Sequence, residues 1–574
     1  MILVIDNYDS PNYKTELSEG SRVCEELRGT GCYILITSRN SLNPEICYGS
    51  DQTVLTPLDT KDLVKLFKKH AGFNNNDYKK DKKIRSFIKD YLKSNTYLVI
   101  LAARLVSTSS LEEVLNSIFI EHNIKENDEP IEGRGTNDKT IFEHLTELFN
   151  ISDVFNSEEK RSIFYNMSLL KIAGAGYKVF FERAFDKSIR GEYKKHFKEL
   201  VKNFWVFSNN KTATTVITMQ PLVRELILCK KEDFKYDYVR KYVEYLNDHS
   251  FFRTYDEKIA GVIEDNTAAL EMLEILTTKE DKKKETDYAC LMAKTASNFD
   301  IIKDVENAYK YGTEAVSILN EIDYKALNDA QLYDVALSYN IAGYAILHHY
   351  NKKGSDDEAL NALEKVKIIL GKMSKEKCDQ LDVKILDTTN KGDIAAVSMA
   401  KKDYNKMLKI HEDNKRFREK LLNEYKDKGT EEEIILLCIK IADSCKGIGT
   451  AYYHIAGKHF KKGNYADSKE CFEKSVRFQN EAVVNYTMAY GDNYHFQIAI
   501  SQNRKVGALL KQYECFPEDM EKEKIKLALK EMKEAEKYLS NMSMKNGKEY
   551  KDCIDRIKKL ALLQEEIKEK EKQL

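Results

Sequence analysis

Most of this chain carries the pattern of paired helices joined by short turns. From about residue 233 to residue 574, apolar residues recur at helical spacing, and small residues stand where two antiparallel helices would touch. The chain has only 6 Pro and 24 Gly among 574 residues, so little interrupts long helices. Successive helical pairs bury their apolar faces by stacking on one another. The sequence therefore predicts a mainly α protein with an α-solenoid of helical hairpins over 233–574.

Three of these pairs match the tetratricopeptide pattern, in which small residues let two helices approach and a large residue fills the gap. The matching positions are Ala296, Phe299, Ala308, Gly312 and Ala315, then Leu347, Tyr350, Gly354, Ala359, Leu363 and Val366, and finally Tyr452, Ile455, Ala456, Gly463, Ser468, Phe472 and Ser475. The units recur about every 50 to 60 residues, which indicates extended helices or insertions. The helix expected over 549–574 is rich in Lys and Glu and should cap the solenoid with its polar face outward.

The first 58 residues carry a different pattern, that of strand, helix, strand, loop and strand. Met1–Ile5 and Tyr33–Ile36 are short apolar runs typical of buried parallel strands. Polar residues follow both runs: Asp6 and Asn7 follow the first, and Ser38 and Arg39 follow the second. The carboxyl ends of parallel strands share one edge of a sheet, where α/β nucleotide-binding proteins place Mg²⁺ ligands and phosphate-binding groups. We therefore expect a partial P-loop α/β segment, although no Gly-x-x-x-x-Gly-Lys-Ser/Thr loop occurs in the sequence.

Two more domains are expected between these parts. After Leu58 the apolar period becomes helical, and Thr60 is a suitable N-cap, so 59–124 should form a small helical domain. Residues 138–229 carry several helix patterns and then two short apolar runs on either side of Asn209-Asn210. That order is typical of a winged-helix domain.

The composition limits the kind of partner and compartment. Charged residues make up 32% of the chain and the net charge is −1, which gives no overall bias toward nucleic acid or acidic membranes. The longest apolar runs are too short to span a bilayer. The 11 Cys are scattered without a Cys-x-x-Cys pair, as in reduced intracellular proteins. We therefore expect a cytoplasmic protein with neither membrane nor nucleic acid as a partner.

Five segments, taken in order, resemble the later half of the NB-ARC module of STAND nucleotidases, the signal-transduction ATPases related to apoptosome and plant-resistance proteins. They are Leu3-Val-Ile-Asp-Asn-Tyr-Asp9 (Walker B), Ile34-Leu-Ile-Thr-Ser-Arg39 (first sensor), Leu55-Thr-Pro-Leu58, Phe142 through Gly176 (winged helix) and Ile217-Thr-Met-Gln-Pro-Leu-Val-Arg-Glu-Leu226. The last segment is similar to the Met-His-Asp or Met-His-Pro segment that closes the module in bacterial members. Many of these members continue into tetratricopeptide repeats. The resemblance assigns 1–58 to the C-terminal part of the nucleotide-binding domain.

The resemblance also implies roles for single residues. Asp6 would hold Mg²⁺, and Asn7 would orient the attacking water; an amide cannot accept its proton, so we expect slow ATP hydrolysis at most. Arg39, next to Ser38, would contact the γ-phosphate and so distinguish ATP from ADP. Gln220 replaces the histidine that contacts ADP in the family and can donate a hydrogen bond but no charge. The alternatives are a turn cap for Asp6, a surface salt bridge for Arg39 and a solvated hydrogen bond for Gln220.

Two departures from the family pattern affect nucleotide binding. The Gly-Leu-Pro motif is replaced by Asn95-Thr-Tyr-Leu-Val-Ile100, which has no proline. The absent phosphate loop would supply most of the contacts to the β- and γ-phosphates. We therefore expect this chain by itself to bind ATP or ADP weakly or not at all, with Mg²⁺ and nucleotide belonging to an intact family protein. The chain is then a portion of a longer protein, a gene model that begins late at Met1, or a homologue that has lost the loop.

The expected function is regulatory. The repeats would bind a protein or peptide ligand and control an ATP/ADP-dependent switch that assembles into homo-oligomers. One alternative is a catalytically inactive adaptor whose repeats bind a partner constitutively. A winged-helix transcription regulator is another alternative, and it requires an exposed winged helix. The missing loop and Asn7 disfavour an autonomous ATPase.

Overall fold

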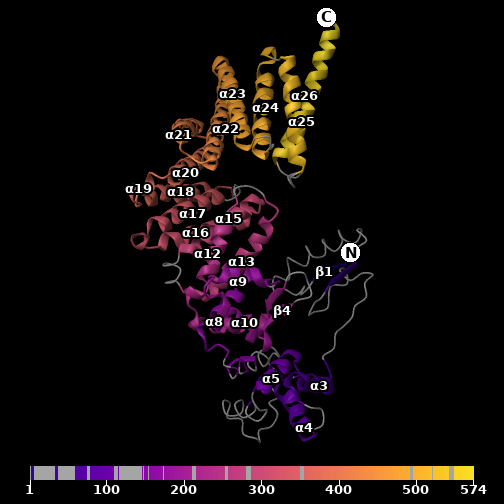
Figure 1. Cartoon of the computed structure of the whole chain (residues 1–574). Coiled ribbons are helices and arrows are strands. Elements are labelled where there is room, and N and C mark those ends of the chain that lie inside the picture. The colour runs from indigo at the N-terminus through magenta and orange to yellow at the C-terminus, as the bar shows by residue number, and fades with distance from the viewer. Residues whose placement is uncertain are drawn as a thin grey trace. The chain divides into compact units, whose positions relative to one another are not determined.

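Helices dominate the computed structural model of this chain (Figure 1). The structure describes residues 2–5, 33–36, 58–73, 78–92, 94–108, 114, 145–146, 148–150, 152, 154–171, 173–209, 215–252, 256–278, 286–348, 354–491, 495–519, 521–541 and 548–573. The chain divides into two compact units, 1–152 and 153–574. No helix within the described ranges combines the length and apolar character that crossing a bilayer requires. The predicted mainly α fold class is confirmed; the domain boundaries predicted within it stay predictions.

The two N-terminal strands pair in parallel. β1 (Ile2–Ile5) lies beside β2 (Tyr33–Ile36), with Ile2 opposite Tyr33 and Ile5 opposite Ile36. The carboxyl ends of both strands therefore lie at one edge, as the sequence predicts. The predicted site residues Asp6, Asn7, Ser38 and Arg39 lie outside the described residues, as does the expected third strand at 53–55.

The rest of the first unit is helical where it is described. Its elements are α3 (Thr60–Ala71), α4 (Tyr78–Ser86), the π-helical turn Phe87–Tyr91 and α5 (Thr96–Thr108). The N-cap of α3 is Asp59 and not Thr60, because the Asp59 carboxylate accepts the Asp62 N–H at 2.7 Å. The first turn of α5 is capped in the same way by Asn95, whose side-chain oxygen accepts from the N–H groups of Tyr97 and Leu98.

The second unit begins with a winged helix. Its elements in chain order are α8 (Glu158–Ser168), β3 (Ala175–Gly176), α9 (Tyr177–Ala184), α10 (Arg190–Lys202), β4 (Val206–Asn209), β5 (Val216–Met219) and α11 (Pro221–Cys229). The antiparallel sheet has the order β3-β5-β4, so the last strand lies between the other two. The helices and this sheet enclose Phe181, Phe197 and Trp205, the one tryptophan of the chain. The helix-then-hairpin pattern in the sequence is confirmed as a winged-helix fold.

A short connection joins the winged helix to the next helices. It consists of the 3₁₀ turns Lys231–Asp233 and Tyr236–Tyr238, followed by α12 (Arg240–His249) and α13 (Ile259–Leu276). The Tyr165 hydroxyl on α8 donates to the Lys230 carbonyl at 2.6 Å, and the Ser162 hydroxyl donates to the Tyr238 carbonyl at 3.0 Å. These bonds fix the connection against the winged helix.

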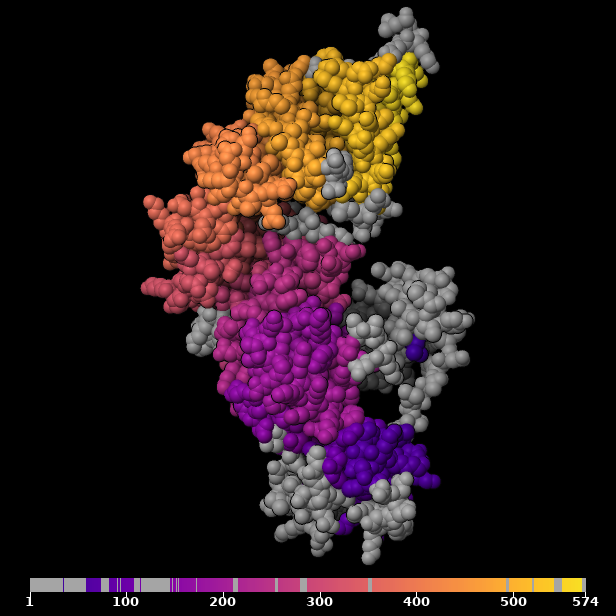
Figure 2. All heavy atoms as spheres, in the orientation of Figure 1, coloured from indigo at the N-terminus to yellow at the C-terminus, as the bar shows by residue number. Residues whose placement is uncertain are grey.

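The remainder is a stack of antiparallel helical pairs. The pairs are α15 (Thr286–Ile301) with α16 (Val305–Glu321), α17 (Asp329–Leu347) with α18 (Ser355–Leu370), α20 (Leu381–Ala400) with α21 (Tyr404–Tyr425), α22 (Glu431–Lys461) with α23 (Tyr465–Tyr490), and α24 (Phe496–Cys515) with α25 (Lys522–Asn541). Short helices also occur at Tyr324–Ala326, Lys375–Cys378 (α19) and Pro517–Asp519, and α26 (Lys548–Gln573) follows the last pair. Each first helix contacts the first helix of the next pair, and each second helix packs against the following one (Figure 1). Figure 2 shows the same residues with all heavy atoms as spheres. This is the predicted α-solenoid, which we call the array.

The small residues predicted from the sequence allow this close packing. Ala296, Ala308, Ala359 and Ala456 are fully buried between helices. A Cβ added at Gly312 would lie only 3.1 Å from the Ile346 side chain. These tetratricopeptide-like positions therefore lie at helix–helix contacts, as the pattern predicts, whereas Tyr350 lies outside the described residues.

Turns between the helices use backbone with positive φ. Gly354 and Gly463, two of the positions that match the repeat pattern, have φ values of 93° and 78°. Two lysines occupy this conformation at other turns, Lys303 at 68° and Lys402 at 60°. Each of these lysines precedes an aspartate that caps the next helix. These turns thus share a residue with positive φ. The sequence indicates this conformation only where the residue is glycine.

Candidate functional site

Gln220 is the one predicted site residue that the structure describes. It is the N-cap of α11, half-buried, with extended backbone between β5 and Pro221. Pro221 suits the first helical position because its missing N–H would have no partner there. Among the described residues, the Gln220 side chain has no hydrogen-bond partner and does not cap the helix. Its amide is therefore available to a ligand or to water.

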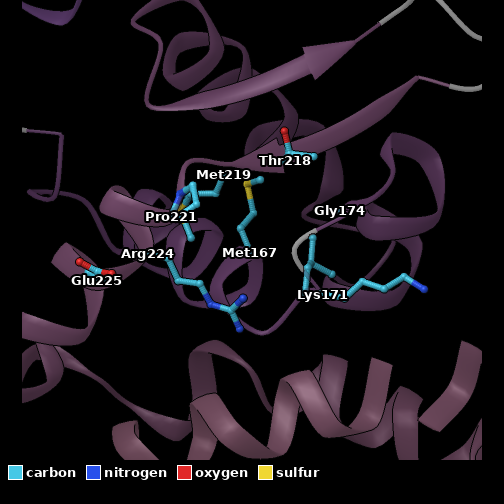
Figure 3. A pocket seen from close by; sticks show the side chains of 9 residues that line it. Met167, Lys171, Gly174, Thr218, Met219, Pro221, Arg224 and Glu225 are labelled. Carbon is cyan, nitrogen blue, oxygen red and sulfur yellow. The ribbon is translucent and has the colours of Figure 1, made fainter. Parts of the chain in front are cut away.

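A pocket opens beside this junction, between the end of α8, strand β5 and the first turn of α11 (Figure 3). Its volume is about 140 Å³. Its lining residues are Met167, Leu170, Lys171, Gly174, Thr218, Met219, Pro221, Arg224 and Glu225. Most of this lining is apolar, and its cations are Lys171 and Arg224, whose side chains extend in different directions (Figure 3).

Arg224 lies in unusual surroundings for a guanidinium. Its Nε donates to the sulfur of Met272 on α13 at 3.2 Å, and a thioether is a weak acceptor. Burial lowers the pKa of Arg224, and the nearby charge of Glu271 acts in the opposite direction. No described carboxylate lies within ion-pair distance of its terminal nitrogens. The charge of this side chain is therefore poorly compensated.

Other contacts join the winged helix to α12 and α13. Lys171 binds Glu264 at 3.1 Å and Asp265 at 3.4 Å, and Arg183 binds Asp265 at 3.6 Å. The Arg183 guanidinium also lies 4.6 Å from the ring centre of Tyr245 on α12. A displacement of α12 or α13 would therefore change contacts at the C-terminal end of α9 and at Lys171, which lines the pocket.

The array contains a polar row, which we define as Asn340, Asn390, Asp393, Asp443, Lys446 and Gln497 on the first helices α17, α20, α22 and α24. The Asn340 amide donates to Asp393 at 2.7 Å and to Asn390 at 3.3 Å. Farther along, Lys446 donates to Gln497 at 2.9 Å and lies 3.3 Å from Asp443. Charged and amide groups thus run along the helices that face one another in successive pairs.

The two acids of the polar row have opposite pKa shifts. Burial raises the pKa of Asp393 to about 6, and the hydrogen bond from Asn340 only partly opposes this effect. Burial also disfavours the charge of Asp443, but Lys446 and Lys440 outweigh it and lower the pKa of Asp443 to about 2. Asp443 is therefore a stable anion at neutral pH. Ionised Asp393, in contrast, lowers the free energy of unfolding at neutral pH.

We predict that Asp393→Asn stabilises the array by about 2 kcal/mol at pH 7. A shift of about two pKa units is equivalent to about 3 kcal/mol, and part of this is lost because asparagine must direct its oxygen toward Asn340. The folded state binds the Asp393 proton more tightly than the unfolded state does, so the stability it provides is present below about pH 4 and lost as the pH rises through about 6. Urea denaturation between pH 4 and 7 measures this slope of the free energy of unfolding against pH.

The matched control is Asp387→Asn on the same helix, where the carboxylate forms a part-exposed pair with Lys391. It should change stability by less than about 0.5 kcal/mol. If both variants behave alike, or if the wild-type slope persists in Asp393→Asn, Asp393 is not the titrating group.

The sequence analysis names Gln220, whose role stays a prediction, and it does not name Arg224, Asp393 or Asp443. Two signals were available. Asp443 follows the apolar run Ile434-Ile-Leu-Leu-Cys-Ile, where an acid is unexpected, and Asp393 and Asp443 stand fifty positions apart, as Asn340 and Asn390 do. Arg224 has no such signal, because only its contact with Met272 on another helix makes it unusual.

Comparison with known proteins gives little further information. No protein-family model matches this sequence, and no curated protein matches it. Among solved structures, it is similar to a STAND (signal transduction ATPase with numerous domains) protein with a tetratricopeptide repeat sensor from Pyrococcus horikoshii. The two are 13% identical with a TM-score of 0.32, over 98% of this chain and 80% of that chain. A similarity of this size carries no argument about fold or function.

Proposed function

We propose that this chain is a regulatory protein of the STAND type, in which the array binds a protein or peptide and controls a nucleotide-dependent switch. The observation that carries the proposal is the attachment of the winged helix to α13, the helix that precedes the array. Lys171 and Arg183 pair with acids on α13, and Arg224 contacts Met272 on the same helix. A switch needs such a contact between its two parts. A ligand bound to one part then shifts the equilibrium only if it binds the two states of the switch with different affinities.

The attachment continues into the array through buried polar bonds. Asn266 on α13 donates to the Thr295 hydroxyl on α15 at 3.1 Å, and Asn298 donates to the Ser250 carbonyl at 2.8 Å. All four side chains are fully buried. Breaking such bonds leaves unsatisfied groups, so α12, α13 and α15 should move together or not at all.

The array supplies a surface suited to a protein ligand. The first helices of its pairs carry exposed apolar side chains, including Tyr344 on α17 and Met399 on α20. Aromatic and methionine side chains are enriched in protein-binding surfaces. Stacked helical repeats commonly use such surfaces for binding.

The nucleotide part of the proposal rests on two features. β1 and β2 are parallel neighbours, so the segments beginning with Asp6 and Thr37 follow strand ends at one edge. The unbonded amide of Gln220 suits a phosphate oxygen as acceptor. For the first unit by itself, we propose that Asp6 binds Mg²⁺ and that Arg39 beside Ser38 binds the γ-phosphate.

Calorimetric titration of the full chain with Mg·ADP tests this assignment. We predict weak binding, with a dissociation constant well above micromolar, that weakens at least fivefold in Gln220→Ala because one hydrogen bond to a charged group is lost. Gln380→Ala is the matched control. Gln380 is also a glutamine at the N-cap position with extended backbone, and its side chain does not cap its helix. No binding at millimolar Mg·ADP, or an equal loss in both variants, would favour the constitutive adaptor instead.

A further inference from the structure

The pocket beside α11 presents a cation without an anion. Its volume of about 140 Å³ is far above the roughly 10–15 Å³ that one water needs. Lys171 is already paired with Glu264 and Asp265, whereas Arg224 has only the Met272 sulfur as an acceptor among the described residues. A half-buried guanidinium is normally paired with an acid, because removing a charge from water is costly.

The charges around Arg224 come from three elements. On α11, Glu225 is exposed and lines the pocket edge; on α13, Glu271 is exposed and lies nearby. On the segment after α8, Lys171 adds a second positive charge, which is neutralised by its own acids. None of the described acids therefore neutralises Arg224 directly.

The rest of the pocket suits a small oxyanion with an apolar group. Met167, Leu170, Met219 and Pro221 supply an apolar wall, and the Thr218 side chain lies at its edge (Figure 3). Gly174 lets the pocket lining lie close against β5, because a Cβ there would lie 2.5 Å from the Thr218 methyl group. A guanidinium binds carboxylate and phosphate oxygens through two parallel hydrogen bonds.

We propose that this pocket binds a small organic oxyanion, a carboxylate or phosphate with a short apolar group, through Arg224. The site is separate from the Gln220 amide, which does not line the pocket. Arg224 also contacts Met272 on α13, so a ligand that binds Arg224 would change the contact between the winged helix and α13. The site would therefore let a small metabolite act on the same junction as the array.

Calorimetry on the full chain tests this with two probes, inorganic phosphate and butyrate, which differ in headgroup and apolar tail. We expect saturable binding of at least one probe and at least tenfold weaker binding in Arg224→Gln, which keeps donors but loses the charge. Arg416→Gln is the control, since Arg416 is exposed and paired with Asp413; it should leave the affinity within twofold. The probe that binds more tightly shows which combination of headgroup and apolar tail the pocket prefers.

A second measurement separates ligand binding from a structural role. Without added anion, Arg224→Gln should be at least as stable as the wild type to urea, because an uncompensated charge is removed. A clear loss of stability in anion-free buffer would mean that Arg224 is a packing residue and would overturn the proposal. Absence of saturable binding at millimolar phosphate and butyrate, or binding unchanged by Arg224→Gln, would also overturn it. These probes carry no nucleoside, so such a failure leaves the Mg·ADP test of Gln220 unaffected.

Discussion

Gly174→Ala is expected to destabilise the winged helix by about 4 kcal/mol. An added Cβ would lie 2.1 Å from the Ile217 carbonyl oxygen on β5, a backbone atom that cannot turn away. Gly174 also has a φ of 79°, which costs an alanine about 1–2 kcal/mol. Overpacking adds about 1–3 kcal/mol. Urea denaturation followed by the fluorescence of Trp205, which is buried in this domain, reports the change directly.

Gly463→Ala separates the two causes. Its φ of 78° is nearly the same, but nothing lies within 4 Å of the added Cβ. This variant should cost about 1 kcal/mol in the array and leave the Trp205 transition in place. Equal losses from both substitutions would show that backbone conformation, and not the contact with β5, is decisive at Gly174.

Arg418→Ala is expected to destabilise the centre of the array by about 4 kcal/mol. Arg418 on α21 is only 3% exposed. Its guanidinium donates to the Thr388 hydroxyl on α20 at 3.1 Å and to the Lys440 carbonyl and Ser444 hydroxyl on α22 at 2.6 and 2.8 Å. Alanine would leave a cavity and remove the charge that faces Asp393 and Asp443. Hydrogen exchange should therefore accelerate in α20, α21 and α22.

Arg416→Ala is the control on the same helix. Arg416 is 74% exposed and pairs with Asp413 one turn away, so its loss should change stability by less than about 0.5 kcal/mol. Arg418→Lys keeps the charge but cannot reach acceptors on two helices. Its loss of stability should lie between the losses in Arg418→Ala and Arg416→Ala. A loss confined to α21, without faster exchange in α20 and α22, would contradict a role in joining the pairs.

Features that depend on local pattern were predicted well from the sequence. The parallel strands at Ile2–Ile5 and Tyr33–Ile36 and the order of the winged helix follow from apolar period and residue type. The capping residue of α3 was off by one position, because Asp59 and Thr60 are both good N-caps and only hydrogen-bond geometry separates them.

Features that depend on contacts between distant segments could not be predicted. The charge of Arg418 is satisfied by residues 22 to 30 positions away, and the pKa of Asp393 depends on burial by neighbouring pairs. Arg224 contacts the sulfur of Met272 on α13, 48 positions away, and no pattern near Arg224 indicates this contact. Composition and period carry no information about such pairings, whereas the structure gives them directly.

Hydrogen exchange of the full chain with and without millimolar Mg·ADP tests the central claim, that nucleotide and array act on one junction. Slower exchange should appear in residues 216–229, around Gln220, and extend to α13, which contacts Arg224, Lys171 and Arg183. Protection that stops at α11 and leaves α13 unchanged would contradict the proposed coupling.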